Sequence, residues 1–474
     1  MFDSINDNCQ GKYEMGEKET DEEVASIKTK RSKTSGRARS TSSRNTIKKI
    51  SNILGRIILS LSLLYGITNV IVRWQTIKPI LFPFREFSKA EKNEILIIVS
   101  PPYSIREKKI ELNYHHLIAN DIYHHVIKNM LIHNFDENYV IRIGVLEKET
   151  IEYENKAVEI ADKYKATLVI GSMIDKMGIT NSVLIRDPVI GSDLPKKHYV
   201  VYGNVIRFDN DNVLETLLSD GILQTRYLVK HSIGLIHYYR REYQSAINFF
   251  EFALDSLTKN IDPSPTYLLL GDSYLKQNPL DTTSATRAIA KYQRITELNL
   301  DTYISQAYQS MGYCYFSIIK DYDAAISCYS KAIEHSYDPR MYELRGRAYY
   351  EKSLSESKRK NYEVVISLLD LAKLDFERAI LLAPSNRSFV SDMLCNIGNI
   401  SYSKYGEDSA AVKYKEAIQY YPNNYAFFNL VEIYCRKGQF GTAKEYYRRM
   451  TDRKLKKTAS SEIMRVLDNR KMEK

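Results

Sequence analysis

The sequence predicts, in order, one transmembrane helix, a small α/β domain and a long all-α superhelical solenoid. The solenoid follows from a spacing of small and aromatic residues that recurs from residue 227 to residue 450. The α/β domain follows from apolar runs that alternate with helical patterns between residues 94 and 210. The transmembrane helix follows from an uncharged run that ends at residue 72.

The chain has 474 residues and a formal net charge of +10, which is distributed unevenly. Residues 1–27 carry eight Asp and Glu against two Lys, whereas residues 28–56 carry ten Lys and Arg and no acid. Both segments are poor in large apolar residues, so we expect residues 1–52 to form a disordered tail, acidic and then basic. We expect a second basic tail at residues 456–474. Anionic lipid is a possible partner of the basic tail, and nucleic acid is disfavoured.

The apolar run at residues 53–72 has the length of a membrane span. Its twenty residues contain one charge, Arg56, near one end, and at about 1.5 Å per residue they cover the roughly 30 Å of a hydrocarbon core. A cleaved signal peptide and a buried helix are the alternatives. We predict a single transmembrane helix at residues 53–74 that contacts the lipid bilayer through residues 53–72. The excess of cations before it predicts a cytoplasmic N-terminus and an extracytoplasmic C-terminal bulk.

The α/β domain is expected at residues 90–210. Buried strands are predicted at residues 94–99, 139–145 and 166–172, and helices at residues 108–132 and 151–165. The order strand, helix, strand, helix, strand indicates parallel strands. Two further apolar runs, at residues 181–187 and 198–208, alternate more and could pair antiparallel at an edge of the sheet.

No catalytic, cofactor or metal site is expected. No glycine-rich phosphate loop follows any of the predicted strands. The helix at residues 108–132 carries a run of histidines, but their spacing provides no third ligand, so ordinary surface histidines are favoured over a metal site. This run comprises His115, His116, His124 and His125, with His133 further along. The five cysteines show no zinc-binding spacing.

A 34-residue pattern repeats about six times over residues 222–455. It places a glycine at position 8, alanines at positions 20 and 27, and an aromatic residue at position 24. The first unit has Gly234, Tyr243, Ala246, Phe250 and Ala253. The pattern recurs as Gly271, Tyr274, Ala288 and Tyr292; as Gly312, Tyr315, Ala325, Tyr329, Ala332 and Pro339; as Gly346, Tyr349, Ala372, Phe376, Ala379 and Pro384; as Gly398, Ala410, Tyr414, Ala417 and Pro422; and as Tyr434, Ala443 and Tyr447.

This pattern resembles the tetratricopeptide repeat, a pair of antiparallel helices that stacks on its neighbours. The small residues should let the two helices of a unit approach, and the aromatic residue at position 24 should fill the gap to the next unit. The second and fourth units carry insertions, notably at residues 352–368, which we expect to be projecting loops. The sixth unit lacks the glycine and is a candidate cap.

The resemblance implies that a protein or peptide partner binds in the concave groove formed by the first helices. The resemblance implies that the groove is lined mainly by first-helix positions 2, 5, 9 and 12. Positions 5 and 9 give the candidate groove residues His231, Asp272, Gln309, Tyr313, Glu343, Arg347 and Asn399. The Lys/Asn/Arg set that grips a C-terminal carboxylate in chaperone-binding members is missing, which disfavours that ligand.

The whole chain looks like a group of bacterial membrane-anchored tetratricopeptide proteins, and its middle segment is reminiscent of the N-terminal domains of periplasmic TolB-like proteins. The leading interpretation is therefore a membrane-anchored scaffold or adaptor that is not an enzyme. The alternatives are an enzyme whose α/β domain acts on a substrate recruited by the repeats, a nucleic-acid-binding regulator that uses the basic tail, and an organelle surface receptor with the opposite topology.

Overall fold

The computed structural model describes residues 94–104, 114–128, 140–146, 149–152, 154–174, 178–186, 199–207, 217–257, 261–298 and 300–461. The predicted tail at residues 1–52 and the predicted transmembrane helix at residues 53–74 lie outside these ranges. Among the residues inside them, no helix combines the length and the apolar character that crossing a bilayer requires. The described chain forms two compact units, and the division between them falls after Ser232.

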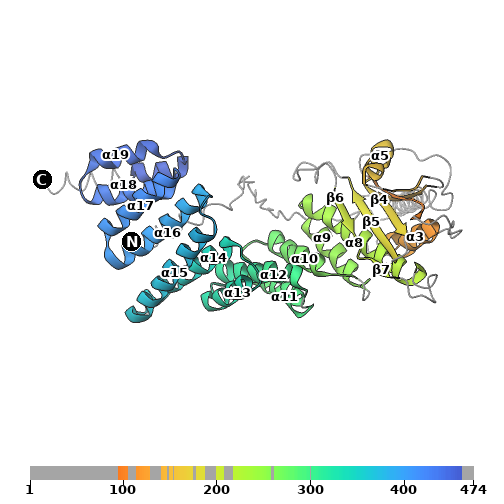
Figure 1. Cartoon of the computed structure of the whole chain (residues 1–474), viewed down its shortest axis with the longest axis horizontal. Helices are drawn as coiled ribbons and strands as arrows, with labels where there is room; N and C mark the ends of the chain where they lie inside the picture. The colour runs from red at the N-terminus through yellow and green to blue at the C-terminus, as the bar shows by residue number, and fades with distance from the viewer. Residues whose placement is uncertain are drawn as a thin grey trace, which may run out of the picture. The chain divides into compact units, whose positions relative to one another are not determined.

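The first unit is built on a seven-stranded sheet (Figure 1). Its main strand order is β3-β1-β4-β5-β6, with β2 beside β4 and β7 beside β5. Strands β3, β1 and β4 are parallel, and β5 and β6 continue the sheet antiparallel, as the alternating runs near this edge suggested. The strands are β1 (Glu94–Val99), β2 (Tyr103–Ser104), β3 (Val140–Val145), β4 (Leu168–Ile174), β5 (Gly178–Ile185), β6 (Tyr199–Tyr202) and β7 (Ile206–Arg207).

Helices cover both faces of this sheet. On one face, Leu96 of β1 and Val169 of β4 form a buried cluster with Ile160 of α5 (Glu154–Tyr164). On the other face, the buried side chain of Asn181 in β5 donates hydrogen bonds to the Gly221 carbonyl oxygen (2.9 Å) and to the Gln224 Oε1 atom (3.2 Å). These partners belong to η3 (Leu217–Gly221) and to the start of α8 (Ile222–Tyr239). Both faces being covered explains why β1 is a continuous apolar run.

The predicted helix at residues 108–132 is described over α3 (Tyr114–Ile122), which continues into the π-helical turn η2 (Tyr123–Ile127). Arg226 of α8 binds the Asp121 carboxylate of α3 through two hydrogen bonds, of 2.9 and 2.5 Å. This ion pair joins α3 to α8 across 105 residues of sequence.

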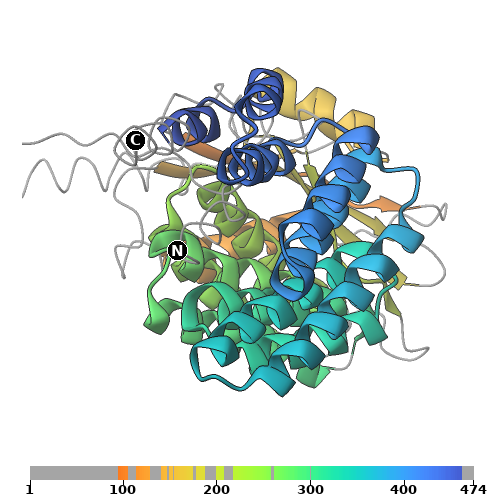
Figure 2. The ribbon, with the colours of Figure 1, turned by 90° about the vertical axis from the view of Figure 1, so that its left-hand side faces the viewer.

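The second unit is a succession of antiparallel helix pairs, each of which packs on the next. Figures 1 and 2 show the succession from green to blue. After α8 come α9 (Tyr243–Leu254), α10 (Ser264–Gln277), α11 (Thr282–Leu298), α12 (Asp301–Tyr313) with η4 (Cys314–Ile319), α13 (Tyr322–Glu334), α14 (Pro339–Lys358), α15 (Tyr362–Leu382), α16 (Arg387–Tyr405), α17 (Glu407–Tyr420), α18 (Asn424–Arg436) and α19 (Phe440–Arg449). This is a helical solenoid of tetratricopeptide type, as the sequence pattern predicts.

The aromatic residue at position 24 packs in two directions. It lies against the glycine at position 8 of its own repeat, and it also belongs to the buried cluster that reaches the next repeat, as Tyr292 does with Ala307 and Met311 and as Tyr329 does with Ala348. A Cβ atom on Gly398 would lie 2.4 Å from the Tyr414 ring, and one on Gly271 would lie 2.5 Å from the Tyr292 ring. The same contact joins Gly234 to Phe250, Gly312 to Tyr329, and Gly346 to Phe376. The glycine is therefore required because an aromatic ring of the second helix occupies the space of its side chain.

The insertions are helical and do not form loops. In the fourth repeat α14 and α15 have 20 and 21 residues, and only residues 359–361 separate them. In the second repeat the added residues lengthen α11 to 17 residues. The expectation of projecting loops was wrong because the segment at residues 352–368 contains no proline or glycine that would end a helix.

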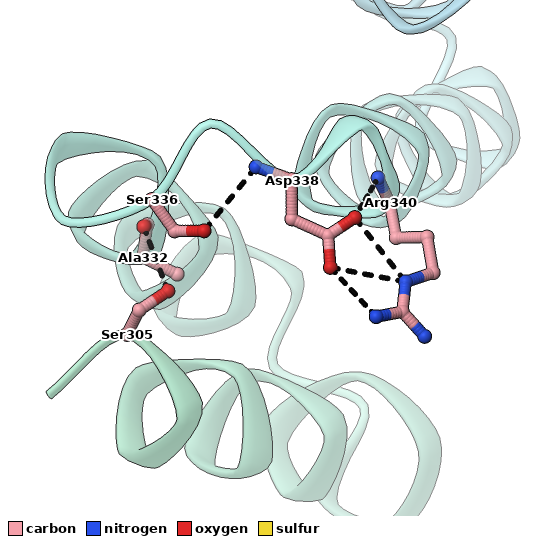
Figure 3. Close-up of polar contacts among 5 residues, drawn as sticks. All are labelled: Ser305, Ala332, Ser336, Asp338 and Arg340. Atoms are coloured by element: carbon pink, nitrogen blue, oxygen red, sulfur yellow. Dashed lines mark hydrogen bonds and ion pairs between the residues drawn. The ribbon is translucent and has the colours of Figure 1, made fainter. Parts of the chain in front are cut away.

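Polar contacts fix the junctions between units. Lys404 of α16 binds Asp370 of α15 at 2.5 Å, and equivalent pairs join Lys352 to Asp323 and Lys437 to Asp408. Figure 3 shows the turn that leads from α13 into α14, where the Asp338 carboxylate caps α14 by accepting from the Arg340 backbone N–H at 2.9 Å. Each of the three ion pairs joins the second helix of one repeat to the C-terminal half or the C-cap of the first helix of the next.

The solenoid continues past the predicted end of the repeats. Residues 453–461 are helical, and Leu455 and Ala459 are buried in the cluster formed by the last two units. The beginning of the segment assigned to a basic C-terminal tail is thus a packed helix, because one of its faces covers the apolar surface of the sixth unit.

Candidate functional site

The first helices of the last three repeats line a shallow hollow that is open to solvent. Residues of α14, α16 and α18 contribute most of its wall, and one tyrosine comes from α17. The hollow therefore lies on the first-helix side of the solenoid, where the resemblance places the groove. It is lined by Tyr350, Leu354, Asn399, Tyr402, Ser403, Tyr414, Asn429, Glu432, Ile433 and Arg436.

Two asparagine side chains meet in this hollow. The Tyr414 hydroxyl donates to Asn399 Oδ1 at 2.7 Å, and Asn429 Nδ2 donates to the same oxygen at 3.3 Å. Asn399 is 6% exposed, and these hydrogen bonds fix the orientation of its amide. The amides of two successive repeats are thus joined by their own hydrogen bond, and Tyr414 of the second helix holds the Asn399 amide in place.

The edge of the hollow carries both signs of charge. Arg436 Nε lies 2.7 Å from the carboxylate of Glu407, and the Arg436 guanidinium lies 5.4 Å from the centre of the Tyr402 ring. Glu432 lines the hollow one helical turn before Arg436. Because Arg436 is already paired with Glu407, the hollow presents no isolated cation to an acidic ligand.

Asn399 is the one predicted groove residue that lines this hollow. His231 is buried, and burial lowers its pKa to about 4, so its side chain is not presented to a ligand. Asp272 accepts a hydrogen bond of 2.6 Å from the Tyr292 hydroxyl. Burial raises the pKa of Asp272, and the hydrogen bond from Tyr292 opposes that rise.

The other four predicted residues lie on α12 and α14. Tyr313 is 45% exposed, and Gln309 is half-buried one turn before it. Glu343 and Arg347 approach to 4.0 Å, and the Arg347 guanidinium lies 5.5 Å from the centre of the Phe316 ring. Arg347 therefore packs against an aromatic residue of the preceding repeat as well as facing outward.

Sequence reasoning missed most of the residues that line the hollow. Tyr350 and Tyr402 occupy position 12, which the repeat pattern identifies as a groove position but which was not used to select candidates. Glu432 occupies position 9 of the sixth unit, and Arg436 follows it by one turn. The sixth repeat lacks the glycine at position 8 that aligns the others. Aligning it on Tyr434, which corresponds to Tyr315 and Tyr349 of earlier repeats, would have identified Glu432 and Arg436.

A second cleft, of about 180 Å³, lies in the α/β unit, between the start of α5 and strands β4 to β6. Two acidic residues, Glu152 and Glu154, lie on its wall with the hydroxyl groups of Ser182 and Tyr202. Within the described ranges, no three His, Cys, Asp or Glu side chains come together as a metal-binding group.

The fold and the hollow define a class: an α/β unit followed by tetratricopeptide-type repeats whose first helices form a recess. Among similar solved structures is the C-terminal part of a TPR repeat-containing protein from Cytophaga hutchinsonii, which is 16% identical, with 48% of this chain and 86% of that chain covered and a TM-score of 0.37. YrrB, described as a TPR protein with an unusual peptide-binding site, is 19% identical; the match covers 45% of this chain and 97% of YrrB, with a TM-score of 0.31. MamA is 20% identical; the match covers 41% of this chain and 91% of MamA, with a TM-score of 0.33.

No protein-family model matches the chain. No curated protein sequence matches it either. The TM-scores of these three structures are below 0.5, so the assignment of the repeats rests on the residue spacing and helix packing described above.

Proposed function

We propose that this chain is a scaffold or adaptor that binds a peptide segment of a protein partner in the hollow between α14, α16 and α18. The observation that supports the proposal most directly is the convergence of three successive first helices on one recess lined by two amides and three tyrosines. Ligand pockets combine apolar and aromatic surface with placed polar groups, and here Leu354, Ile433 and the three tyrosines supply the apolar and aromatic surface.

The half-buried Asn429 amide suits the backbone of an extended peptide, because an asparagine amide both donates and accepts hydrogen bonds, as a peptide group does. The Asn399 amide serves to orient Asn429, since its own Oδ1 atom already accepts two hydrogen bonds. The rings of Tyr350 and Tyr402 offer apolar surface to a side chain of the ligand, and tyrosine is a frequent anchor of binding energy. Since Arg436 is engaged by Glu407, we expect an internal peptide segment instead of a free C-terminal carboxylate.

The proposal is tested with a peptide that is selected from a random library for binding to the full chain. Fluorescence anisotropy gives the affinity of this peptide for the parent protein and for the double variant Tyr350→Ala with Asn429→Ala. Truncating two anchors should weaken binding by roughly tenfold or more. Tyr420→Ala, at an exposed tyrosine of α17 outside the hollow, is the matched control. Equal affinity of the double variant and the control, with unchanged helical circular dichroism, would exclude the hollow as the site.

The proposal extends to location on sequence grounds alone. We propose that residues 53–72 anchor the chain in a membrane by a single pass, with the N-terminus cytoplasmic, and that the basic segment before them contacts anionic lipid. The proposal assigns no catalytic step to either unit. The likeness of the α/β unit to TolB-like domains stays a prediction.

A further inference from the structure

Helix α15 carries a row of exposed large apolar side chains. Val364, Leu371, Leu374 and Leu381 are 36%, 40%, 51% and 68% exposed. Their spacing of seven, three and seven residues places them on one face of the helix. Exposed apolar side chains scattered singly are normal, but a continuous row along one helix marks an interaction surface.

The row has the pattern of a coiled-coil seam. Ser367 and Arg378, both exposed, fill the two remaining seam positions, so the seam reads Val364, Ser367, Leu371, Leu374, Arg378 and Leu381. The opposite face of α15 is buried in its own solenoid through Leu368, Leu369, Ala372, Phe376 and Ala379. We call the six exposed residues the α15 seam.

We propose that the α15 seam is a self-association surface on which the α15 seam of a second copy of this chain packs antiparallel. A two-fold axis midway between Leu371 and Leu374 sets Leu371 level with Leu374 of the partner subunit. The same axis sets Val364 level with Leu381 of the partner subunit. Every large apolar side chain of the seam thus meets an apolar side chain of the second copy.

The polar residues of the seam select the antiparallel orientation. A parallel pair would stack Arg378 on the identical residue of the second copy, which is repulsive. In the antiparallel pair, Arg378 lies level with Ser367 of the partner subunit, within one helical turn of the partner's Glu363. Each Arg378 therefore faces an uncharged side chain with an acidic neighbour, and the contact between the two identical arginines is avoided.

The size of the seam predicts a weak dimer. The 21 residues of α15 extend about 32 Å at 1.5 Å per residue. One helix pair of that length lies at the low end of interface areas for specific complexes, so association should depend on concentration. The proposed peptide site is lined by α14, α16, α17 and α18 and not by α15, so either proposal can fail without the other.

Disulfide cross-linking of the full chain in detergent tests the register. Val364→Cys and Leu381→Cys chains are oxidised separately and as a mixture, beside the parent with its native cysteines, and dimers are scored on non-reducing gels. The antiparallel seam predicts a cross-linked dimer in the mixture well above the parent level, and little in either variant alone, because identical positions lie about 25 Å apart along the pair. Equal cross-linking by one variant alone, or no dimer in the mixture, would overturn the proposal.

Light scattering on the full chain provides a second measurement. Leu374→Lys should shift the concentration at which the dimer forms upward by at least tenfold, since it places a charge at the centre of the seam. Leu298→Lys changes an equally typical exposed leucine, 40% exposed at the end of α11, and should leave the dimer unchanged. The assignment would be contradicted if the parent chain stayed monomeric at 100 times the protein concentration of the cross-linking experiment. It would also be contradicted if Leu374→Lys and Leu298→Lys shifted the dimerisation concentration equally.

Discussion

Arg345 of α14 donates two hydrogen bonds to the carboxylate of Asp375 on α15, through Nε at 2.8 Å and Nη2 at 2.7 Å. Its third guanidinium nitrogen donates to the Ser330 hydroxyl of the preceding repeat at 3.1 Å. Asp375 is buried, and burial raises its pKa while the Arg345 guanidinium opposes the rise. One side chain thus joins the two helices of the fourth unit to the third unit.

We expect Arg345→Met to destabilise the protein by about 3 to 5 kcal/mol at neutral pH, because it leaves a buried carboxylate without a partner. Chemical denaturation gives the free energy of unfolding. The double variant Arg345→Met with Asp375→Leu should recover most of the loss, since an apolar pair of similar volume can replace a buried ion pair. A single variant that loses less than about 1 kcal/mol would show that the carboxylate is hydrated after the substitution.

The loss in Arg345→Met should also depend on pH. A carboxyl group whose pKa is raised in the folded state favours folding when protonated, and that contribution is lost as the pH rises through the folded pKa. Removing the guanidinium raises the pKa of Asp375 further. The difference between parent and Arg345→Met should therefore narrow as the pH falls from neutral toward 4, and a difference that is constant over this range would contradict the assignment.

Gly398→Ala should destabilise the protein by about 1 to 3 kcal/mol, because its new methyl group would lie 2.4 Å from the Tyr414 ring. Gly441→Ala in α19 is the control, since a Cβ there meets nothing within 4 Å. Replacing that helical glycine should stabilise the protein by about 0.5 to 1 kcal/mol. Thermal melts of the two variants should shift in opposite directions, and equal shifts would mean that the ring yields to the methyl group.

The glycine and aromatic spacing was visible in the sequence, but the contact between the two residues was not. Periodicity identifies which positions are small and which are aromatic, whereas the close approach of the position-24 ring to the glycine of its own repeat requires coordinates. The helical insertion could have been predicted, because residues 352–368 lack the breakers that loops need. The hollow was harder to predict: it depends on how α14, α16 and α18 converge, and side chains such as Asn399 and Asn429 meet only after the units stack.

His231 predicts a second pH effect, located in α8. Burial lowers its pKa to about 4 from the ordinary value near 6.5, so between these values the folded protein binds fewer protons than the unfolded chain. Stability should fall as the pH is lowered through this window, by up to about 3 kcal/mol for this one group. His231→Gln should flatten the dependence of the unfolding free energy between pH 6.5 and 4, whatever its stability at neutral pH. An unchanged slope would assign the acid sensitivity to other groups.

The predicted anchor is tested by two substitutions in residues 53–72. Leu63→Arg and Ile67→Arg should each cost about 2.5 to 3.5 kcal/mol of membrane insertion when placed near the centre of a spanning helix. The double variant should move from the membrane fraction to the supernatant on alkaline extraction, while Leu63→Ala with Ile67→Ala should stay with the parent. Retention of the arginine variant in the membrane fraction would mean that the span is assigned to the wrong residues.

Substitutions at Tyr313 and Arg347 test how far along the solenoid a bound peptide extends. Both lie on first helices, in the third and fourth units, whereas the hollow is formed by the fourth to the sixth units. An extended peptide advances about 3.3 Å per residue, so one long enough to leave the hollow would reach them, and the double variant Tyr313→Ala with Arg347→Ala should weaken its binding by about 1 to 2 kcal/mol. A peptide trimmed to the residues that fill the hollow should bind both proteins equally.

Because Arg347 also packs on Phe316, Arg347→Lys with Tyr313→Phe is the matched control for lost packing, and melting temperatures are compared for all variants. If the long peptide binds the alanine variant as tightly as the parent, the ligand contacts the hollow without reaching the third unit.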